Sequence, residues 1–433
     1  MRSPTVTLWV TCALGIGCAG AEPEATTPPR DGGVVVEVDA GTRDGGVVPR
    51  CADPAEPIGV ASAPALDPAP TADAIACAAR SIERQLADAD VICLGEDSHG
   101  VAESIYAHGL LLRHLIEDLG ARTIVFEATE ATTEAWDLYL DTRDERDLAR
   151  GFRDMAGSLG ASVEREALLR FLATIDVDAD LHITGFDVAV QSAATIQSIL
   201  DHLDQVEPET TDRWRRAFLT SPDRIADSAD ELATEIADRR AAHVAATSED
   251  AVRRLERDLV NLADGQRFLA RFYDGDFEGG NATYREPGMT RNMLDLLQRR
   301  GDAGPIVMLA HNGHCHRTID IGIDLSGEPT PSVGASLATA LGDDYRTIFQ
   351  FYEGGRELAP TANGFVARDY FHSAAALAGV IFAASDANAF FLPSDTDLVD
   401  FSGRFTYRGE PIIPTEAFDG VHAIRSVTAV TLR

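Results

Sequence analysis

The sequence predicts an α/β protein with a mainly parallel central sheet, flanked by helices and carrying a large helical insertion at about residues 190–300. Short apolar runs, typical of buried parallel strands, alternate with longer stretches that have helical spacing. A strand, a helix and a strand follow one another within residues 91–126, which is a βαβ unit and favours a right-handed parallel crossover. Acidic residues or histidines begin where several of the apolar runs stop.

The individual elements follow from apolar spacing and from start and stop signals. Asp73 caps a first helix that runs to about Leu86. Residues 101–119 have apolar positions at helical spacing and end at Gly120, a frequent stop signal. The predicted strands cover residues 91–94, 123–126, 181–186, 306–310, 345–351, 389–392 and 420–424.

The region between Asp187 and Pro305 lacks a strand pattern and predicts helices only. Its clearest helix covers residues 249–273, where apolar side chains recur at three- and four-residue spacing. We interpret this region as a helical insertion or cap over the strand ends.

Residues 1–17 are expected to form a secretory signal peptide. They carry one positive charge, Arg2, followed by an apolar centre and small residues before Cys18. This sequence resembles a bacterial lipoprotein cleavage box, and an unmodified signal is the alternative. Residues 18–71 are rich in Gly, Pro, Ala, Asp and Thr and predict a flexible tether, which leaves residues 72–433 as the folded domain. We expect an exported protein, periplasmic or in the outer membrane, that meets the membrane only through a lipid on Cys18.

Export permits disulfides between the cysteines of the chain. Cys51 and Cys77 flank the end of the tether and are predicted to pair. Cys93 in a predicted strand and Cys315 beside the late histidines are interpreted as small buried hydrophobic residues. A nucleophilic role for Cys315 is the weaker alternative.

The net charge of −33 excludes several functions. A surface of this sign repels nucleic acid and anionic lipid, and it suits uncharged or cationic ligands. All 37 basic side chains are arginine. The absence of lysine excludes lysine Schiff-base chemistry and a phosphate-binding loop that needs its lysine.

Acidic and imidazole side chains follow four of the predicted strands. They are Glu96 and His99 after residues 91–94, Glu127 after 123–126, Asp187 after 181–186, and His311 and His314 after 306–310. Ligands gather at the carboxyl ends of strands in such sheets, and buried charges are costly unless paired or used, so one functional site is predicted there. Five other histidines, with no polar cluster expected around them, are interpreted as structural: His182, His202, His243, His372 and His422. His114 lies in the middle of a predicted helix and is interpreted as structural too.

Two hydrolytic chemistries need such a set of side chains. In one, a neutral histidine oriented by a carboxylate removes a proton from water. In the other, histidines and carboxylates hold a divalent metal that acidifies its bound water, with His311 and His314 as two of the ligands. The sequence has no Gly-x-Ser-x-Gly motif, so a serine triad is not predicted. We expect no cofactor, with a divalent metal as the alternative.

The motifs, in their order along the chain, resemble those of the erythromycin esterase family. The matching segments are Leu94-Gly-Glu96-Asp-Ser-His99-Gly100-Val-Ala-Glu103, Phe126-Glu127, Gly185-Phe186-Asp187, Tyr284-Arg285-Glu286 and Ala310-His311-Asn312-Gly313-His314. The likeness covers about residues 76–430. It implies an α/β core with helical additions, and hydrolysis of a macrolide lactone ester that inactivates the antibiotic.

The resemblance also implies roles for individual residues. His99 resembles the family's general base, Glu96 and Glu127 its essential acids, and His311 and His314 its other active-site histidines.

One position departs from the family pattern. The family usually carries an arginine nine residues after the general base, where this chain has His108. Histidine is shorter than arginine and titrates near neutrality, so substrate anchoring is expected to differ. We assign substrate-binding roles to His108, Arg285 and Asp187. Another arginine in the same space, such as Arg113 or Arg285, is the alternative.

The leading hypothesis is thus an exported esterase that cleaves a small-molecule carboxylic ester with water activated by His99. A metal-dependent hydrolase using the same residues is the second hypothesis. A non-catalytic haem- or metal-binding lipoprotein is the third.

Overall fold

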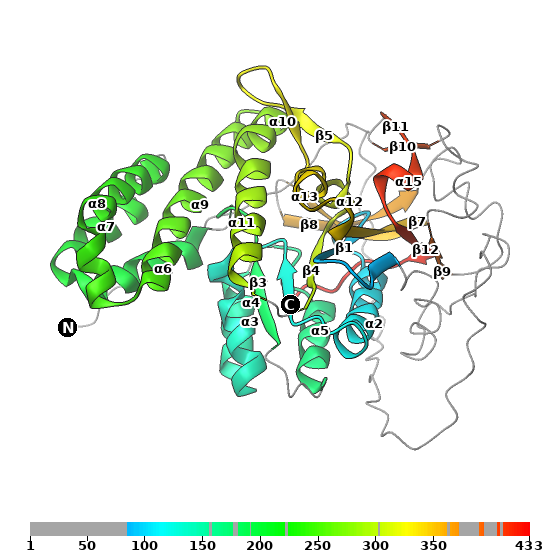
Figure 1. The fold of residues 1–433 in the computed structure, drawn as a ribbon, viewed down its shortest axis with the longest axis horizontal. Coiled ribbons are helices and arrows are strands. Elements are labelled where there is room, and N and C mark those ends of the chain that lie inside the picture. The colour runs from blue at the N-terminus through cyan, green and yellow to red at the C-terminus, as the bar shows by residue number, and fades with distance from the viewer. Residues whose placement is uncertain are drawn as a thin grey trace, which may run out of the picture.

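The computed structural model describes residues 85–433 except for 156–157, 176–180, 191, 221–223, 302–303, 362–363, 372–388, 394–404 and 408–409 (Figure 1). The predicted signal peptide, the tether, most of the first helix, His372 and the Cys51–Cys77 pair lie outside the described residues. In the part of the chain that is described, no helix is long and apolar enough to span a membrane.

The core is an eight-stranded sheet in the order β3–β2–β4–β1–β7–β12–β9, with β8 paired to β7. The strands from β3 to β12 in this order are parallel, whereas β8 and β9 run antiparallel to their neighbours. The strands are β1 (Val91–Glu96), β2 (Thr123–Phe126), β3 (His182–Gly185), β4 (Ile306–His311), β7 (Tyr345–Thr361), β8 (Gly364–Phe371), β9 (Ala389–Pro393) and β12 (Gly420–Val427). The predicted α/β class with a mainly parallel sheet is confirmed.

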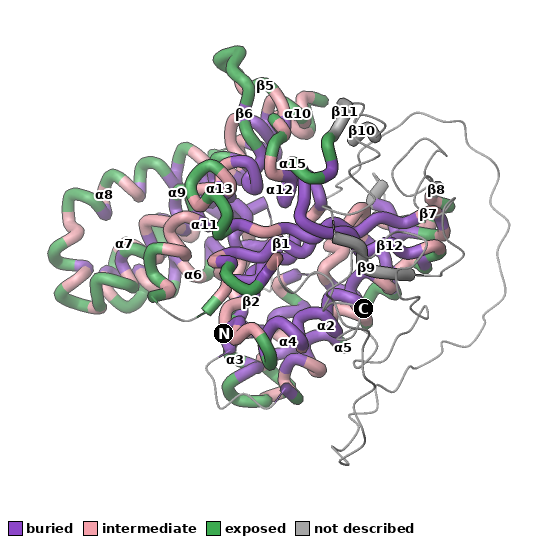
Figure 2. The backbone as a smooth tube through the Cα atoms, turned by 45° about the vertical axis from the view of Figure 1, so that its right-hand side comes forward, coloured by how far each residue is buried: buried purple, intermediate pink, exposed green. Residues whose placement is uncertain are grey.

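Helices cover both faces of this sheet, because alternate strand side chains point to opposite faces. On one face, Ile92 and Leu94 pack with the helices α2 to α5, and on the other, Val91 and Met308 pack with α11 and α13. The strands are buried on both sides, as Figure 2 shows for the centre of the molecule. These helices are α2 (Ala102–Glu117), α3 (Glu130–Thr142), α4 (Glu145–Asp154), α5 (Val163–Thr174), α11 (Glu286–Arg299) and α13 (Val333–Leu341).

The predicted helical insertion is present and has an apolar core of its own. Trp214, Phe218 and Leu259 are buried at its centre. In Figure 1 it extends from the side of the sheet where β3 lies. Its helices are α6 (Ser192–Val206), α7 (Pro208–Thr220), α8 (Ile225–Ala246) and α9 (Glu249–Tyr273). The short helix α10 (Phe277–Gly280) and a π-helical turn, η3 (Asn281–Arg285), lead from it into α11.

The interpretation of Cys93 and Cys315 as separate buried hydrophobic residues was wrong, because they form a disulfide. Cys93 lies in β1, and Cys315 ends α12 (Asn312–Cys315), the short helix that follows β4. Because β1 and β4 are neighbours in the sheet, the two sulfurs meet although 222 residues separate the cysteines in sequence. The disulfide therefore joins the two segments that carry His99 and His314.

The remaining hairpins lie outside the main sheet. They are formed by β5 (Asp320–Ile323) with β6 (Pro329–Pro331), and by β10 (Phe405–Tyr407) with β11 (Glu410–Ile412).

Candidate active site

The four strand ends singled out in the sequence meet at one edge of the sheet. Glu96 ends β1 and is the ladder partner of His311, which ends β4. Phe126 at the end of β2 lies between Leu309 of β4 and Gly185 of β3. Parallel pairing in register thus brings residues from four distant segments to a common edge.

Glu96 orients the ring of His99. The Nδ1–H of His99 donates to Oε1 of Glu96 at 2.7 Å, so a neutral His99 has its lone pair on Nε2. Gly100 fixes the turn that presents this ring: its φ is +79°, and an added Cβ would lie 2.2 Å from the carbonyl oxygen of Leu358. The His99 side chain remains 43% exposed. Its Nε2 lies 3.8 Å from Oε1 of Glu127, beyond hydrogen-bond distance.

Glu127 is the centre of the charged cluster. Its Oε1 accepts from Nη2 of Arg285 at 2.6 Å and lies 3.4 Å from Nε2 of His314. Its Oε2 accepts from the backbone N–H of His311 at 3.0 Å. Burial raises the pKa of Glu127, but the charges of His314 and His99 outweigh burial and hold this pKa well below its ordinary value. Glu127 is therefore a fixed negative charge facing His99.

His314 is held as a cation between two carboxylates. Its Nδ1–H donates to Oε1 of Glu286 at 2.6 Å, and its Nε2–H faces Glu127. Burial lowers the pKa of His314, but the charges of Glu286 and Glu127 raise it to about 9. At neutral pH this imidazolium supplies positive charge and cannot accept a proton.

His311 connects the segments that follow β1 and β4 through hydrogen bonds of its ring. Its Nε2–H donates to the carbonyl oxygen of Asp97 at 3.0 Å, and its Nδ1 accepts from the backbone N–H of Gly313 at 3.1 Å. Both ring nitrogens are thus engaged, and the ring lies beside that of His99 with 5.4 Å between centroids. Of the three histidines at this edge, His99 is the one whose geometry leaves a nitrogen for an external proton.

Arg285 is tied to two carboxylates. Its Nε and Nη2 donate to Asp187 at 3.0 and 2.7 Å, and Nη2 also donates to Glu127. Burial alone would lower the pKa of Arg285, but these carboxylates raise it above its ordinary value. Asp187 in turn accepts from the backbone N–H of Val188 at 2.8 Å. Arg285 ends the π-helical turn η3, a distortion that is frequent at functional sites.

The pKa of His99 results from opposing effects. Burial lowers it, but the charge of Glu127 and the hydrogen bond to Glu96 outweigh burial and raise the pKa above its ordinary value. Burial raises the pKa of Glu96, but the bond to His99 more than offsets this and the pKa is lowered. The ionised Glu96 can then stabilise a positive charge on His99.

His108 lies next to this cluster but is buried. Its Nε2–H donates to the carbonyl oxygen of Gly95 at 3.3 Å. Burial lowers the pKa of His108 to about 4, which keeps it neutral. Its part in substrate binding stays a prediction. Arg113, an alternative arginine, pairs with Glu117 on the surface of α2 and is not part of the cluster.

Two residues of the site were missed by sequence reasoning. Glu286 has no exposed surface and binds His314, although the sequence indicated only that it belongs to a motif. Arg165 lies in the first turn of α5, in a region for which no element was predicted. A signal existed for Arg165, since Ser162 is a typical helix N-cap and a basic residue in the following turn opposes the helix dipole.

His202 and His243, expected to lack a polar cluster, have one in the helical insertion. Nε2 of His202 lies 3.1 Å from Nδ1 of His243, whose Nε2–H donates to Glu207 at 3.0 Å. Among the described residues, no three His, Cys, Asp or Glu side chains are grouped so that they could hold a metal ion.

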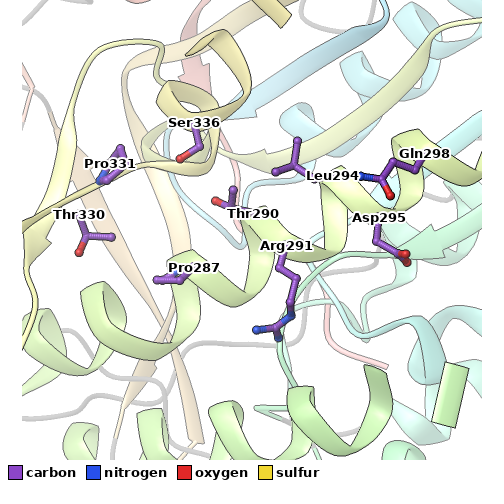
Figure 3. Close-up of a pocket in the computed structure, with 9 residues that line it drawn as sticks. All are labelled: Pro287, Thr290, Arg291, Leu294, Asp295, Gln298, Thr330, Pro331 and Ser336. Atoms are coloured by element: carbon purple, nitrogen blue, oxygen red, sulfur yellow. The ribbon is translucent and has the colours of Figure 1, made fainter. Parts of the chain in front are cut away.

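A separate surface cavity of about 590 Å³ lies between α11, β6 and α13 (Figure 3). Thr290 and Leu294 of α11, Pro331 of β6 and Ser336 of α13 contribute to its lining, and no residue of the charged cluster does.

The fold and the site together define an α/β protein with a histidine–carboxylate cluster of the kind that hydrolases use. The erythromycin esterase family model matches residues 116–401, and the chain belongs to this family. A search of curated protein sequences finds no match.

Solved structures show the same fold at low sequence identity. A histidine-to-asparagine variant of the erythromycin esterase EreC in its open conformation is 18% identical, with a TM-score of 0.65 over 81% of this chain and 94% of that chain. A Bacillus cereus protein is 16% identical, with a TM-score of 0.63 over 86% and 96% of the two chains. A succinoglycan biosynthesis protein is 15% identical, with a TM-score of 0.60 over 86% and 96%.

Proposed function

We propose that this chain hydrolyses a carboxylic ester of a small molecule, with His99 as the base that activates water. One observation carries the proposal: His99 is oriented by a carboxylate through Nδ1 and keeps Nε2 free on a side chain that is 43% exposed. A general base needs this combination of a fixed tautomer and an accessible lone pair.

The charges of the site support a substrate that is uncharged or cationic. Within the hydrogen-bonded cluster, four carboxylates outnumber the two fixed cations, Arg285 and His314; the carboxylates belong to Glu96, Glu127, Asp187 and Glu286. An anionic substrate would be repelled by this surplus of carboxylates. A macrolide lactone, the ester that the family name implies, is therefore the first substrate to test. Nucleic acid is not proposed as a partner.

The test is hydrolysis of a panel of macrolides of different ring size and of simple aryl esters by the purified chain. Mass spectrometry should detect products that have gained one water. Protein purified without added metal should be active and insensitive to chelators, which separates the proposal from a metal-dependent hydrolase. If no ester of the panel is hydrolysed, or if a chelator abolishes turnover, the proposed mechanism is wrong. A visible absorption band on titration with haem, in a chain without esterase activity, would favour a haem-binding lipoprotein.

We also propose that the chain is exported and anchored by a lipid on Cys18. The buried Cys93–Cys315 disulfide supports export, because disulfides persist in oxidising compartments. Fractionation of cells expressing the full chain and a Cys18→Ala variant tests this: the variant should leave the membrane fraction, and an unchanged distribution would contradict the proposed anchor.

A further inference from the structure

Arg165 lies beside the charged cluster, at the capped start of α5. The Oγ of Ser162 accepts from the backbone N–H of Arg165 at 3.1 Å and caps α5. The C-terminal segment fixes the same helix end, since Val163 N–H donates to the carbonyl oxygen of Thr431 at 2.9 Å. The guanidinium of Arg165 lies over the ring of Phe126, 4.9 Å from the ring centroid. Phe126 directly precedes Glu127 in the sequence.

The guanidinium of Arg165 has no carboxylate in contact. Among the described residues it forms neither a hydrogen bond nor an ion pair, and its Nε is buried without a partner. Its surroundings are nevertheless acidic: burial lowers the pKa of Arg165, and the charges of Glu96 and Glu127 offset part of this effect. The Arg165 cation is therefore attracted by the charges of Glu96 and Glu127 but is not hydrogen-bonded to either.

Arg285 provides the contrast. Its guanidinium is paired with the carboxylates of Asp187 and Glu127. The His314 imidazolium is paired with the carboxylates of Glu286 and Glu127. Neither can turn to a substrate without leaving a buried carboxylate unpaired, which is costly. Arg165 can bind an anionic group of a substrate without leaving a carboxylate unpaired. A cation in the first turn of a helix also opposes the helix dipole, so the stability of α5 itself does not explain the position of Arg165.

Ester hydrolysis generates negative charge that this site must neutralise. His99 Nε2 takes a proton from water while the water oxygen bonds to the carbonyl carbon. The electron pair of the carbonyl π bond moves onto its oxygen, which becomes an oxyanion. When this intermediate collapses, the C–O bond to the alcohol breaks, and the leaving oxygen takes the proton from His99.

We propose that Arg165 binds the carbonyl oxygen of the ester and stabilises the oxyanion formed by attack of water. This inference rests on the proposed function of the same site. Arg165 is then a catalytic residue that contacts the substrate from α5, in addition to the fixed cations Arg285 and His314.

The experiment compares the full chain with Arg165→Gln, Arg165→Lys and the matched control Arg113→Gln. Hydrolysis of a simple aryl ester gives kcat and KM. Binding of phenyl methylphosphonate, a stable tetrahedral monoanion, is measured by calorimetry at about pH 6, where His99 is protonated. We expect Arg165→Gln to lose about 10²-fold in kcat with little change in KM, as on removing one oxyanion donor, and to lose phosphonate binding. Arg113→Gln should retain both.

Each outcome decides. If the chain hydrolyses the ester and Arg165→Gln does so equally well, the role of Arg165 is overturned while the proposed function stands. If the phosphonate binds through Arg165 but no ester is hydrolysed, the proposed function fails and the oxyanion site stands. If the chain does neither, both are overturned.

Thermal unfolding checks that Arg165→Gln is folded. If it is not, Arg165→Lys decides, because lysine keeps the charge but lacks the planar guanidinium. A loss of about tenfold in kcat at an unchanged melting temperature supports the proposal, and an unchanged kcat overturns it.

Discussion

Two histidine–glutamate pairs of the molecule form the same kind of hydrogen bond but differ in the surroundings of the second ring nitrogen. At the sheet edge, His99 donates to Glu96 at 2.7 Å, and in the helical insertion His243 donates to Glu207 at 3.0 Å. His99 is partly exposed and keeps its second nitrogen free, whereas His243 is fully buried and uses its second nitrogen on His202. A histidine oriented by a carboxylate is therefore not by itself evidence of catalysis. A second nitrogen open to substrate is also required.

The largest expected effect comes from breaking the pair at the sheet edge. His99→Asn keeps a donor for Glu96 but removes the nitrogen that accepts a proton from water. Turnover of the ester should fall by about 10³-fold, within the range attributed to general base catalysis. Steady-state kinetics and a melting curve measure activity and fold separately. Unchanged turnover in a folded variant would remove His99 from the mechanism.

The Cys93–Cys315 disulfide joins two segments of the sheet edge and has no counterpart in the described part of the helical insertion. The double variant Cys93→Ala, Cys315→Ala should lose about 2–4 kcal/mol of unfolding free energy, the usual contribution of a disulfide. It should also lose activity, since Cys315 directly follows His314. Urea unfolding of the unaltered chain and of the double variant, both without reductant, measures the first effect. Equal midpoints for the two proteins would contradict it.

Sequence reasoning identified the sheet edge because each of its strands is a self-contained apolar run followed by a polar residue. Glu96, Glu127 and Asp187 could be named before their contacts were known for this reason. The disulfide could not be predicted, because its 222-residue separation reveals nothing of the adjacency of β1 and α12. Arg165 was missed for a similar reason: it reaches the edge from a helix that no strand end marks.

A smaller effect is expected from the pair in the insertion. His243→Leu removes the hydrogen bonds to Glu207 and His202 inside a buried region. The free energy of unfolding should fall by about 1–3 kcal/mol, the cost of leaving a buried polar group unpaired. Glu207 retains Arg239 at 2.6 Å, which limits the loss. Ester hydrolysis should stay unchanged. A large loss of kcat in a folded variant would show that the insertion takes part in catalysis.

The smallest effect is the pH dependence of the His99 base. Neutral His99 is the active form, so kcat/KM should rise with pH through the pKa of His99. Burial lowers this pKa, but Glu127 and Glu96 raise it above its ordinary value, which places the acidic limb of the profile above about 6.5. Glu127→Gln removes one of the raising charges and should move the limb to lower pH, whatever its effect on kcat.

Glu207→Gln is the matched control for this shift. It removes the same charge from the other histidine–glutamate pair, where His243 has no surface exposure. The limb should therefore stay in place in Glu207→Gln and move in Glu127→Gln, because only Glu127 faces the base that titrates. If the acidic limb moved equally in both variants, the shift would result from the change in net charge of the protein and not from the contact of Glu127 with His99. A limb below 6.5 in the unaltered chain would mean that a group other than His99 controls turnover.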